Sequence, residues 1–292
     1  MEQEEFVSVR LFGGLGNQIF QFMAGKWLAN ESKSQLYVDT SWLLDGYTHS
    51  NSSISEFQFY KPDREYGEKH RNLMLLYLDR LATITARNIP IFANFVKINA
   101  PRSTGFEDFT TVNLGVQLRG YYQSPQYFEK LMENGEITKS SFELNKPSES
   151  FNSKRNLVPS QGFLAVHVRG GDYLKKKATY VQLTSKYYLE AVNSVREICG
   201  NLPIWVFSDD VNYARKTLSS FSDLYYVDNK SISAAESMKL MSVAKGIICA
   251  NSTFSYWASI ISDSAILIVA PNSWVKEHEQ PKDFFPKGWK LI

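Results

Sequence analysis

The feature that most constrains the fold is a repeated alternation in the second half of the chain. Short apolar runs, long enough for strands but too short for helices, alternate with segments that carry apolar residues at helical spacing. Such alternation predicts a parallel β-sheet covered by helices on both faces, and therefore an α/β fold. The predicted strands are 163–168, 204–207, 224–227, 247–250 and 265–269, and the predicted helices are 188–198, 213–218, 234–244 and 254–261.

The first half of the chain opens with the same kind of pattern. The apolar run 7–12 leads into a glycine-rich turn at 13–18, and apolar residues at helical spacing follow in 19–27. This order predicts strand, turn and helix, with a further strand at 35–39. A long amphipathic helix is predicted over 73–84, with basic residues on its flanks. Two explanations of that basic flank stay open: contact with an anionic membrane, or a solvated face, which is the commoner case.

Between the two halves, the segment 138–161 is rich in Ser, Asn and Pro and poor in apolar residues. This composition is typical of a linker. A chain of 292 residues suits two domains of ordinary size. We therefore predict two domains, 1–150 and 151–292.

Charge and cysteine content exclude several classes of protein. A net charge of +2 argues against a general nucleic-acid binder, which usually has a strong basic excess. The two cysteines, Cys199 and Cys249, lie far apart in sequence and are interpreted as reduced thiols of a cytosolic protein. Neither a signal-peptide layout nor an apolar run of the roughly 20 residues that span a bilayer is present. We predict a cytoplasmic protein, or one peripheral to the inner face of the membrane.

The strongest candidate for chemistry is the motif 167–173, which closes a predicted strand. His167 and Arg169 alternate with valines and therefore point to one side of the strand end. Arginine offers a planar fork of donors that suits a diphosphate, and the two glycines that follow let a ligand approach the backbone. Asp172 could orient either side chain. The alternative is an Arg–Asp pair that braces a tight turn.

Two further motifs follow strands, where parallel sheets bind their ligands. Asp209 and Asp210 could accept hydrogen bonds from a guanine edge or a ribose; alternatively, one of them caps the next helix. Ser252 and Thr253 lie at a predicted helix N-terminus, where N–H groups and the helix dipole attract phosphate. Ordinary Ser/Thr capping is the alternative there.

The glycine turn at 13–18 lacks the GxGxxG spacing and the Gly-Lys-Ser/Thr of a P-loop. Asn17 and Gln18 could present their amides to a ligand, or Asn17 could simply be the helix N-cap. The sequence contains no Asp-x-Asp, the usual metal–diphosphate clamp of metal-dependent sugar transferases, and no HExxH or GxSxG. With four histidines scattered along the chain, we expect no His-based zinc site.

Together, these motifs resemble glycosyltransferase family 11, the α-1,2-fucosyltransferases, which are related to the α-1,6- and protein O-fucosyltransferases. The resemblance spans nearly the whole chain. It implies a GT-B-like fold, with two Rossmann-like domains facing a cleft, the acceptor side in the first and the GDP-sugar donor site in the second. It also implies transfer of L-fucose from GDP-β-L-fucose to the 2-hydroxyl of a terminal galactoside in a glycan, with inversion and with neither metal nor cofactor. The motifs occur in the family's order at 13–18, 120–124, 167–173, 207–210 and 250–257.

The resemblance also assigns roles to individual residues. Arg169 would hold the donor diphosphate, with His167 beside the donor and Asp172 in support. His167 and Asp172 are also the candidates for a general base. The remaining assignments are Asp209 or Asp210 to guanine or ribose, Ser252, Thr253 and Phe254 to the diphosphate and nucleoside, and Asn17 with Gln18 to the acceptor side of the cleft.

One position departs from the family pattern. Gly170 stands where the family usually has a second arginine, which removes a cation near the diphosphate; the lysines 175–177 follow closely. Two alternatives therefore stay open: transfer of another GDP-sugar, and a relative that binds GDP or a glycan without turnover. The expected partners are GDP-fucose and a glycan, with membrane contact through a lipid-linked acceptor and no nucleic acid.

Overall fold

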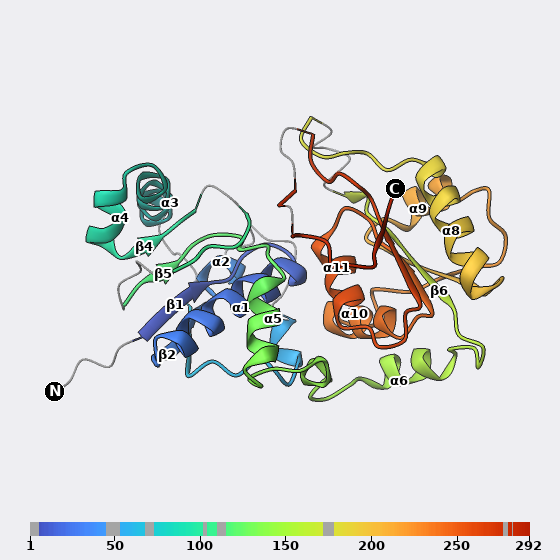
Figure 1. Cartoon of the computed structure of the whole chain (residues 1–292), viewed down its shortest axis with the longest axis horizontal. Helices are drawn as coiled ribbons and strands as arrows, with labels where there is room; N and C mark the ends of the chain where they lie inside the picture. Colours follow the sequence, from blue (N-terminus) through green and yellow to red (C-terminus); the bar gives the residue numbers. More distant parts are fainter. Residues whose placement is uncertain are drawn as a thin grey trace. The chain divides into compact units, whose positions relative to one another are not determined.

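A computed structural model describes residues 6–44, 53–67, 73–101, 104–109, 115–171, 178–276, 280–281 and 283–292. The chain forms two compact units, each built on a parallel β-sheet (Figure 1). Unit 1 comprises Met1–Ser55 and Phe59–Thr138, and unit 2 comprises Glu56–Gln58 and Lys139–Ile292. The units thus divide before the predicted boundary at 150, and a short piece of the first half belongs to unit 2.

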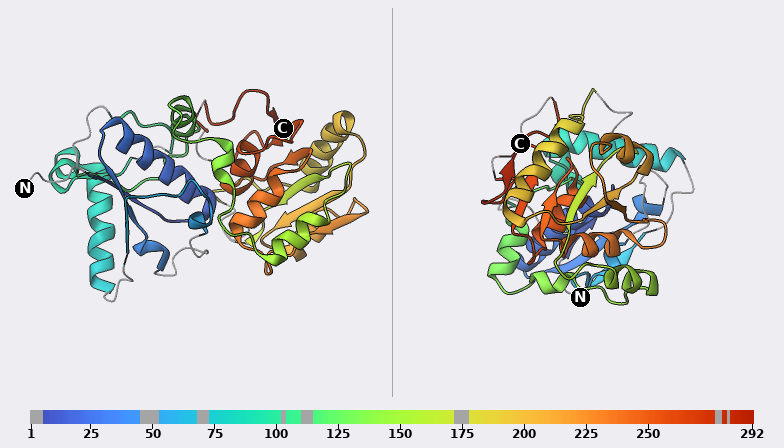
Figure 2. Two further views of the ribbon diagram at one scale, coloured as in Figure 1. Left: turned by 90° about the horizontal axis from the view of Figure 1, so that it is seen from below. Right: turned by 90° about the vertical axis from the view of Figure 1, so that its right-hand side faces the viewer.

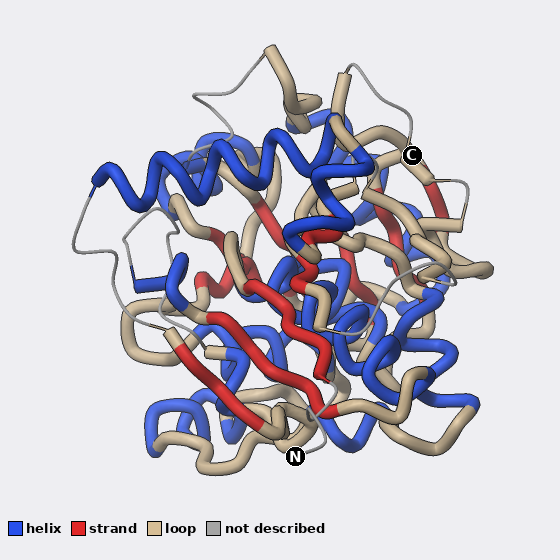
Figure 3. The backbone as a smooth tube through the Cα atoms, turned by 90° about the vertical axis from the view of Figure 1, so that its left-hand side faces the viewer, coloured by secondary structure: helices blue, strands red, loops and turns tan. Residues whose placement is uncertain are grey.

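Unit 1 has a five-stranded sheet in the order β3-β2-β1-β5-β4, with helices on either side of the strands (Figure 3). The predicted strands at 7–12 and 35–39 and the helix between them are confirmed. The helix α1 packs on α5 and on the strands β1 and β2, whereas α3 packs on α4 and β4. The strands are β1 (Phe6–Arg10), β2 (Gln35–Asp39), β3 (Arg64–Tyr66), β4 (Ile98–Asn99) and β5 (Gln117–Leu118); the helices are α1 (Leu15–Glu31), α2 (Ser41–Leu44), α3 (Leu73–Asn88), α4 (Pro90–Val96) and α5 (Gln126–Glu133), with a 3₁₀ turn η1 (Ile54–Glu56).

Unit 2 has a six-stranded parallel sheet in the order β11-β10-β9-β6-β7-β8. The predicted alternation is confirmed, because the five predicted strands are β6 to β10 and the four predicted helices are α8 to α11. The strands are β6 (Leu164–Val168), β7 (Ile204–Ser208), β8 (Leu224–Tyr226), β9 (Gly246–Ile248), β10 (Leu267–Ala270) and β11 (Lys290–Leu291); the helices are α6 (Glu149–Asn156), α8 (Ser185–Cys199), α9 (Val211–Thr217), α10 (Ala234–Ser242) and α11 (Thr253–Ile260), with a 3₁₀ turn η2 (Lys139–Phe142).

Helices cover both faces of this sheet (Figures 1 and 2). Val166 and Val168 of β6 belong to a core cluster that includes Tyr188 and Val192 of α8. The opposite face carries His167, whose ring meets that of Phe254 at the start of α11. Because side chains alternate along a strand, the valines fill the core while their neighbours point to the other side. The alternation expected at the end of this strand is therefore confirmed.

The segment 138–161 is not the linker that its composition predicts. It contains η2 and α6, and two of its aromatic side chains, Phe142 and Phe151, are fully buried. Ser148 caps α6 by accepting a hydrogen bond from the backbone N–H of Phe151 at 3.0 Å. The polar residues of the segment form its outer surface, whereas the two aromatics attach it to unit 2. Within the described parts of the chain, no helix has the length and apolar character needed to cross a membrane.

Candidate functional site

Three of the sequence motifs meet at one edge of the sheet in unit 2. Strand β6 lies between β7 and β9, and all three run parallel, so their carboxyl ends share an edge. Val168 of β6 is paired with Ser208 of β7, which places Arg169 next to Asp209. The chain after β9 continues into the start of α11 at the same edge. This is the edge at which open α/β sheets bind ligands.

Arg169 and Asp209 form an ion pair at this edge. Nη1 of Arg169 lies 3.0 Å from Oδ2 of Asp209, and the side chains are 27% and 29% exposed. The other carboxylate oxygen, Oδ1, accepts a hydrogen bond from the backbone N–H of Gly170 at 2.9 Å. Asp209 thus holds both the guanidinium and the turn that follows it, the bracing role for which Asp172 was considered. Asp172 and the lysines 175–177 lie outside the described residues.

His167 is buried beside this pair. Burial, and then the positive charge of Arg169, lower its pKa to about 3, so the imidazole is neutral at pH 7. Among the described residues Nδ1 has no hydrogen-bond partner, and the ring lies 5.3 Å from that of Phe254. A neutral imidazole carries one donor and one acceptor nitrogen. The side chain can therefore exchange a hydrogen bond with a ligand hydroxyl, but it is a weak base.

The two neighbouring aspartates have different structural roles. Oδ1 of Asp210 accepts a hydrogen bond from the backbone N–H of Tyr213 at 2.9 Å, which caps α9. Its own N–H donates to Oγ of Ser208 at 3.1 Å. Asp210 is therefore the capping residue that sequence analysis offered as an alternative. Of the two carboxylates, Asp209 is the one at the ion pair.

The start of α11 is capped by Ser252, which is buried and accepts a hydrogen bond from the N–H of Phe254 at 3.3 Å. Thr253 and Phe254 are partly exposed. Upstream, the amide of Asn251 donates to the carbonyl oxygens of Val181 and Trp274 and so fixes the approach to the helix. A helix start held in this way presents its first N–H groups toward the sheet edge, where an anion would be stabilised.

Gly170 has no room for a side chain. An added β-carbon would lie 2.9 Å from Cβ of Asp210 and 3.0 Å from Cδ1 of Tyr213. The next residue, Gly171, has a φ of +32°, in the region that favours glycine. The departure from the family's paired arginines therefore has a local cause, because the start of α9 occupies the space that an arginine at position 170 would need.

In unit 1, the amides of the glycine turn are engaged within the protein. Asn17 accepts a hydrogen bond from Nε2 of Gln123 at 2.9 Å, and it is not the N-cap of α1, a position held by Gly14. Gln18 is fully buried and donates to the carbonyl oxygen of Gly13 at 3.0 Å. Gln18 therefore braces the turn from inside, while a ligand role for Asn17 stays a prediction.

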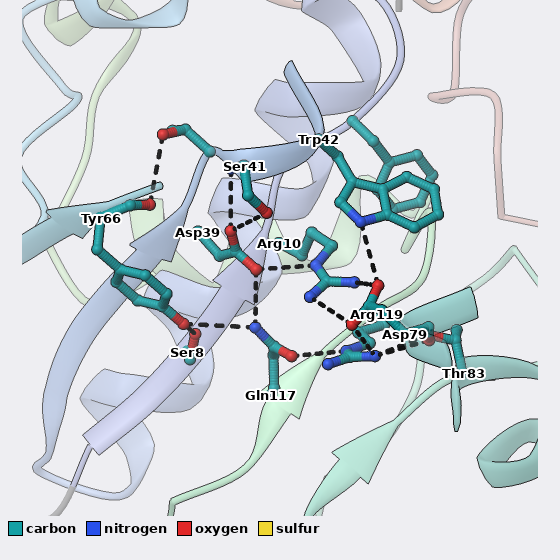
Figure 4. Close-up of polar contacts among 12 residues, drawn as sticks. Ser8, Arg10, Asp39, Ser41, Trp42, Tyr66, Asp79, Thr83, Gln117 and Arg119 are labelled. Atoms are coloured by element: carbon teal, nitrogen blue, oxygen red, sulfur yellow. Dashed lines mark hydrogen bonds and ion pairs between the residues drawn. The ribbon is translucent and has the colours of Figure 1, made fainter. Parts of the chain in front are cut away.

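Sequence analysis missed a charged network inside unit 1 (Figure 4). Arg10, at the end of β1, contacts Oδ2 of Asp39 at 2.8 Å and Oδ2 of Asp79 at 2.6 Å. Arg119 contacts the other oxygen of Asp79 at 3.0 Å. Nε1 of Trp42 also donates to Asp79, at 3.2 Å. The charged residues come from three strand ends and the helix α3, and Trp42 comes from α2.

Charge pairing outweighs burial at Asp79, whereas burial outweighs it at Arg119. Burial alone would raise the pKa of Asp79, but the hydrogen bonds and charges of Arg10 and the charge of Arg119 lower it. Burial, and then the charge of Arg10, lower the pKa of Arg119 to about 10. The sequence signal was a charged residue at the end of each of two apolar strands, Arg10 in β1 and Asp39 in β2. Nothing in the sequence pairs either of them with a residue 40 or more positions away.

Comparison with known proteins supports the family that the sequence motifs indicate. The model of glycosyl transferase family 11 matches residues 110–292, more than half of the chain and four of its five motifs. The O-antigen biosynthesis glycosyltransferase WbnK of Escherichia coli is 26% identical over 290 residues, covering 93% of this chain and 96% of that protein. An α-1,2-colitosyltransferase of Escherichia coli is also 26% identical, with 98% of each chain covered.

Solved structures show the same fold at low sequence identity. The fucosyltransferase NodZ from Bradyrhizobium matches with a TM-score of 0.54 at 15% identity, over 89% of this chain and 94% of that chain. A family 9 glycosyltransferase from Veillonella parvula matches with a TM-score of 0.53 at 12% identity, over 100% of this chain and 87% of that chain. These likenesses confirm the predicted GT-B-like α/β fold. With the family model and the ordered motifs, they show that the chain belongs to glycosyltransferase family 11 and is a glycosyltransferase of the fucosyltransferase-like kind.

Proposed function

We propose that the chain transfers L-fucose from GDP-β-L-fucose to the 2-hydroxyl of a terminal galactoside in a glycan, with inversion at the anomeric carbon. The observation that carries this proposal is the sheet edge of unit 2. It brings together a partly exposed arginine, a neutral buried histidine and a capped helix start. The family supports the class of reaction, and one relative is named for O-antigen biosynthesis, which favours a glycan acceptor.

The proposed chemistry needs stabilisation of the leaving GDP. An inverting displacement through an oxocarbenium-like transition state builds negative charge on the diphosphate. Arg169 supplies a guanidinium, and the start of α11 supplies N–H groups and a favourable dipole. Since the sequence has no Asp-x-Asp clamp, we propose that these groups act without a metal ion.

His167 would contact the donor rather than remove a proton. With its pKa lowered to about 3, the imidazole binds a proton too weakly to serve as an efficient general base near pH 7. Its unpartnered Nδ1 can instead accept a hydrogen bond from a hydroxyl of the donor. Asp172 then remains the candidate base of the two that sequence analysis named.

Replacement of Arg169 tests the proposal. In Arg169→Ala we expect GDP release in the presence of acceptor to fall by about 10²–10³-fold, because one electrostatic contact to the leaving group is lost. Arg169→Lys should recover little activity, since an ammonium cannot replace the planar fork. The matched control is Arg155→Ala, at an exposed position of α6. Near-normal turnover of a folded Arg169→Ala protein would refute the assignment.

A second donor deserves a direct comparison, because a relative at 26% identity is an α-1,2-colitosyltransferase. Initial rates should be measured with GDP-fucose, GDP-colitose, GDP-mannose and UDP-sugars against lactose and the type 1 and type 2 disaccharides. Each assay should be run with and without a chelator. The proposal requires that, among these donors, GDP-fucose give the highest kcat/KM. Loss of activity with chelator would overturn the proposed metal independence.

A further inference from the structure

The side of helix α3 that packs on unit 1 is partly polar. Its inner face carries Asp79, held by Arg10 and Arg119 at 2.6 and 3.0 Å (Figure 4). One turn later, Thr83 accepts a hydrogen bond from Nη1 of Arg119 at 2.8 Å. These polar contacts and the buried Leu76 and Ala86 hold the same side of the helix on unit 1. These contacts fix which side of α3 points outward.

The outward side of α3 is apolar. Five large side chains follow one another at spacings of three, one, three and three residues, which places them on one face of the helix. Each is 45–66% exposed. Sequence analysis predicted an amphipathic helix without assigning its apolar face to a side; in the structure Leu76 is buried, whereas Tyr77, Leu81 and Ile84 face outward. The stripe consists of Met74, Tyr77, Leu78, Leu81 and Ile84.

The next helix extends this surface. Ile91 and Phe95, four residues apart on α4, are 83% and 84% exposed, and Ile89 between the helices is 50% exposed. None of the residues of α4 is buried, although α3 and α4 pack on each other. We call the stripe of α3 together with these three residues the α3–α4 patch; α3 is the long teal helix in the left panel of Figure 2. Eight large apolar side chains exposed on two helices that pack together are more than a soluble surface usually carries in one place, and they indicate an interaction site.

Along the two helices, every charge other than Asp79 is positive. Residues 73–101 contain three basic side chains and one acid, and that acid, Asp79, is paired on the inner face. Arg80 and Arg87 lie three residues beyond Tyr77 and Ile84, along one edge of the stripe; Arg87 is exposed, whereas the guanidinium of Arg80 lies over the Trp42 ring at 5.5 Å. Lys97 is exposed just after α4. A second copy docked face to face would bring these cations together, whereas an anionic surface would complement them.

We propose that the α3–α4 patch docks the protein on an anionic lipid bilayer, with both helices lying in the interfacial region. An apolar face bordered by arginines is the arrangement with which amphipathic helices bind such surfaces. This inference goes beyond the proposed transfer reaction and does not depend on it. It predicts membrane association of the protein without a spanning helix.

Vesicle flotation tests the proposal directly. The full-length protein is mixed with vesicles of phosphatidylglycerol and phosphatidylcholine, or of phosphatidylcholine alone. The protein should float with the anionic vesicles and less with the neutral ones, and raised salt should weaken flotation with the anionic vesicles only. The double variant Ile91→Asp/Phe95→Asp should bind anionic vesicles more than about tenfold more weakly, because two apolar side chains no longer enter the interface.

The control introduces the same change elsewhere. Leu157→Asp/Ile266→Asp replaces two apolar residues of unit 2 that are 59% and 62% exposed, and it should float like the unaltered protein. Thermal melting checks that each variant is folded, and the single change Arg87→Glu provides a second weakening variant on an exposed charge. Absence of flotation by the unaltered protein, or equal flotation of all variants, overturns the proposal. Light scattering provides the other contradicting outcome. If the unaltered protein is a dimer and Ile91→Asp/Phe95→Asp is a monomer, the patch binds a second copy and the proposal is wrong.

Discussion

Residues at the tip of β6 show how strongly local packing shapes this site. Gly170 leaves no space for a β-carbon, and Asp209 binds both the N–H of that glycine and the guanidinium before it. A second arginine would have to displace the start of α9. The site therefore depends on one well-held guanidinium, whose position is set by a carboxylate from the neighbouring strand.

The adjacent aspartates allow a matched test at the residue scale. Asp210→Ala removes the cap of α9 and should lower the free energy of unfolding by about 0.5–2 kcal/mol, with little effect on transfer. Asp209→Ala removes a partly exposed ion pair with Arg169 and a hydrogen bond from the N–H of Gly170, so its loss of stability should be similar, about 1–2 kcal/mol. Transfer should nevertheless fall about tenfold or more, because the guanidinium loses its orientation.

Chemical denaturation and GDP-release kinetics on the two variants separate the roles. If Asp210→Ala lost activity while Asp209→Ala kept it, the assignment of the ion pair to the donor site would be wrong. A loss of stability in Asp209→Ala with transfer unchanged would show that the pair with Arg169 is a structural brace only.

Elements of unit 1 are held by charge as well as by apolar packing. Asp79 is the point where α3 meets β1 and β5, through contacts with Arg10 and Arg119. Asp79→Ala should lower the free energy of unfolding by about 3 kcal/mol, because it leaves two largely buried cations with one remaining carboxylate, Asp39. Asp108→Ala, at an exposed position, should change stability by less than about 0.5 kcal/mol.

The measurement is urea denaturation of both variants beside the unaltered protein. Because the folded-state pKa of Asp79 is lowered, the stability it contributes is present above the usual carboxylate pKa and is lost as pH falls below it. The gap between the unaltered protein and Asp79→Ala should therefore narrow in acid. A gap that stays constant with pH would mean that the carboxylate charge is not what holds α3.

The sequence predicted the elements with strong periodicity and missed those without it. The alternation in unit 2 comes from runs of four to six apolar residues, which identify β6 to β10 and their helices. The strands β4 and β5 have two residues each, too few for any pattern. The segment 138–161 was likewise misjudged, because its many polar residues outweigh the two buried aromatics, Phe142 and Phe151, in its composition.

The orientation of α3 lay beyond sequence reasoning for a different reason. Periodicity identifies an apolar face but not the side on which the rest of the chain lies, and here Asp79 and Thr83 decide it through a distant arginine. Of the candidate site, sequence analysis located the strand-end motifs correctly. It left open which aspartate caps α9 and which pairs with Arg169, since that choice depends on the register of β6 against β7.

At the scale of the whole molecule, the chain changes unit twice near residue 57. Glu56–Gln58 belongs to unit 2, where Phe57 pairs with Leu144 in a β-bridge and its ring lies 5.6 Å from that of Phe142. Two residues later, Phe59 belongs to unit 1, and its ring lies 5.7 Å from that of Phe22. Both phenylalanines are buried, so two similar side chains in one short segment support different cores.

This pair permits a prediction about cooperativity. Phe57→Ala and Phe59→Ala each remove a buried aromatic ring and should cost about 3–5 kcal/mol. Hydrogen exchange should show the loss of protection in unit 2 for Phe57→Ala, around η2 and α11, where Phe142 stacks on Trp257. For Phe59→Ala the loss should fall in α1, which carries Phe22. If both variants lost protection equally throughout the chain, the two units would unfold as a single cooperative body despite their separate cores.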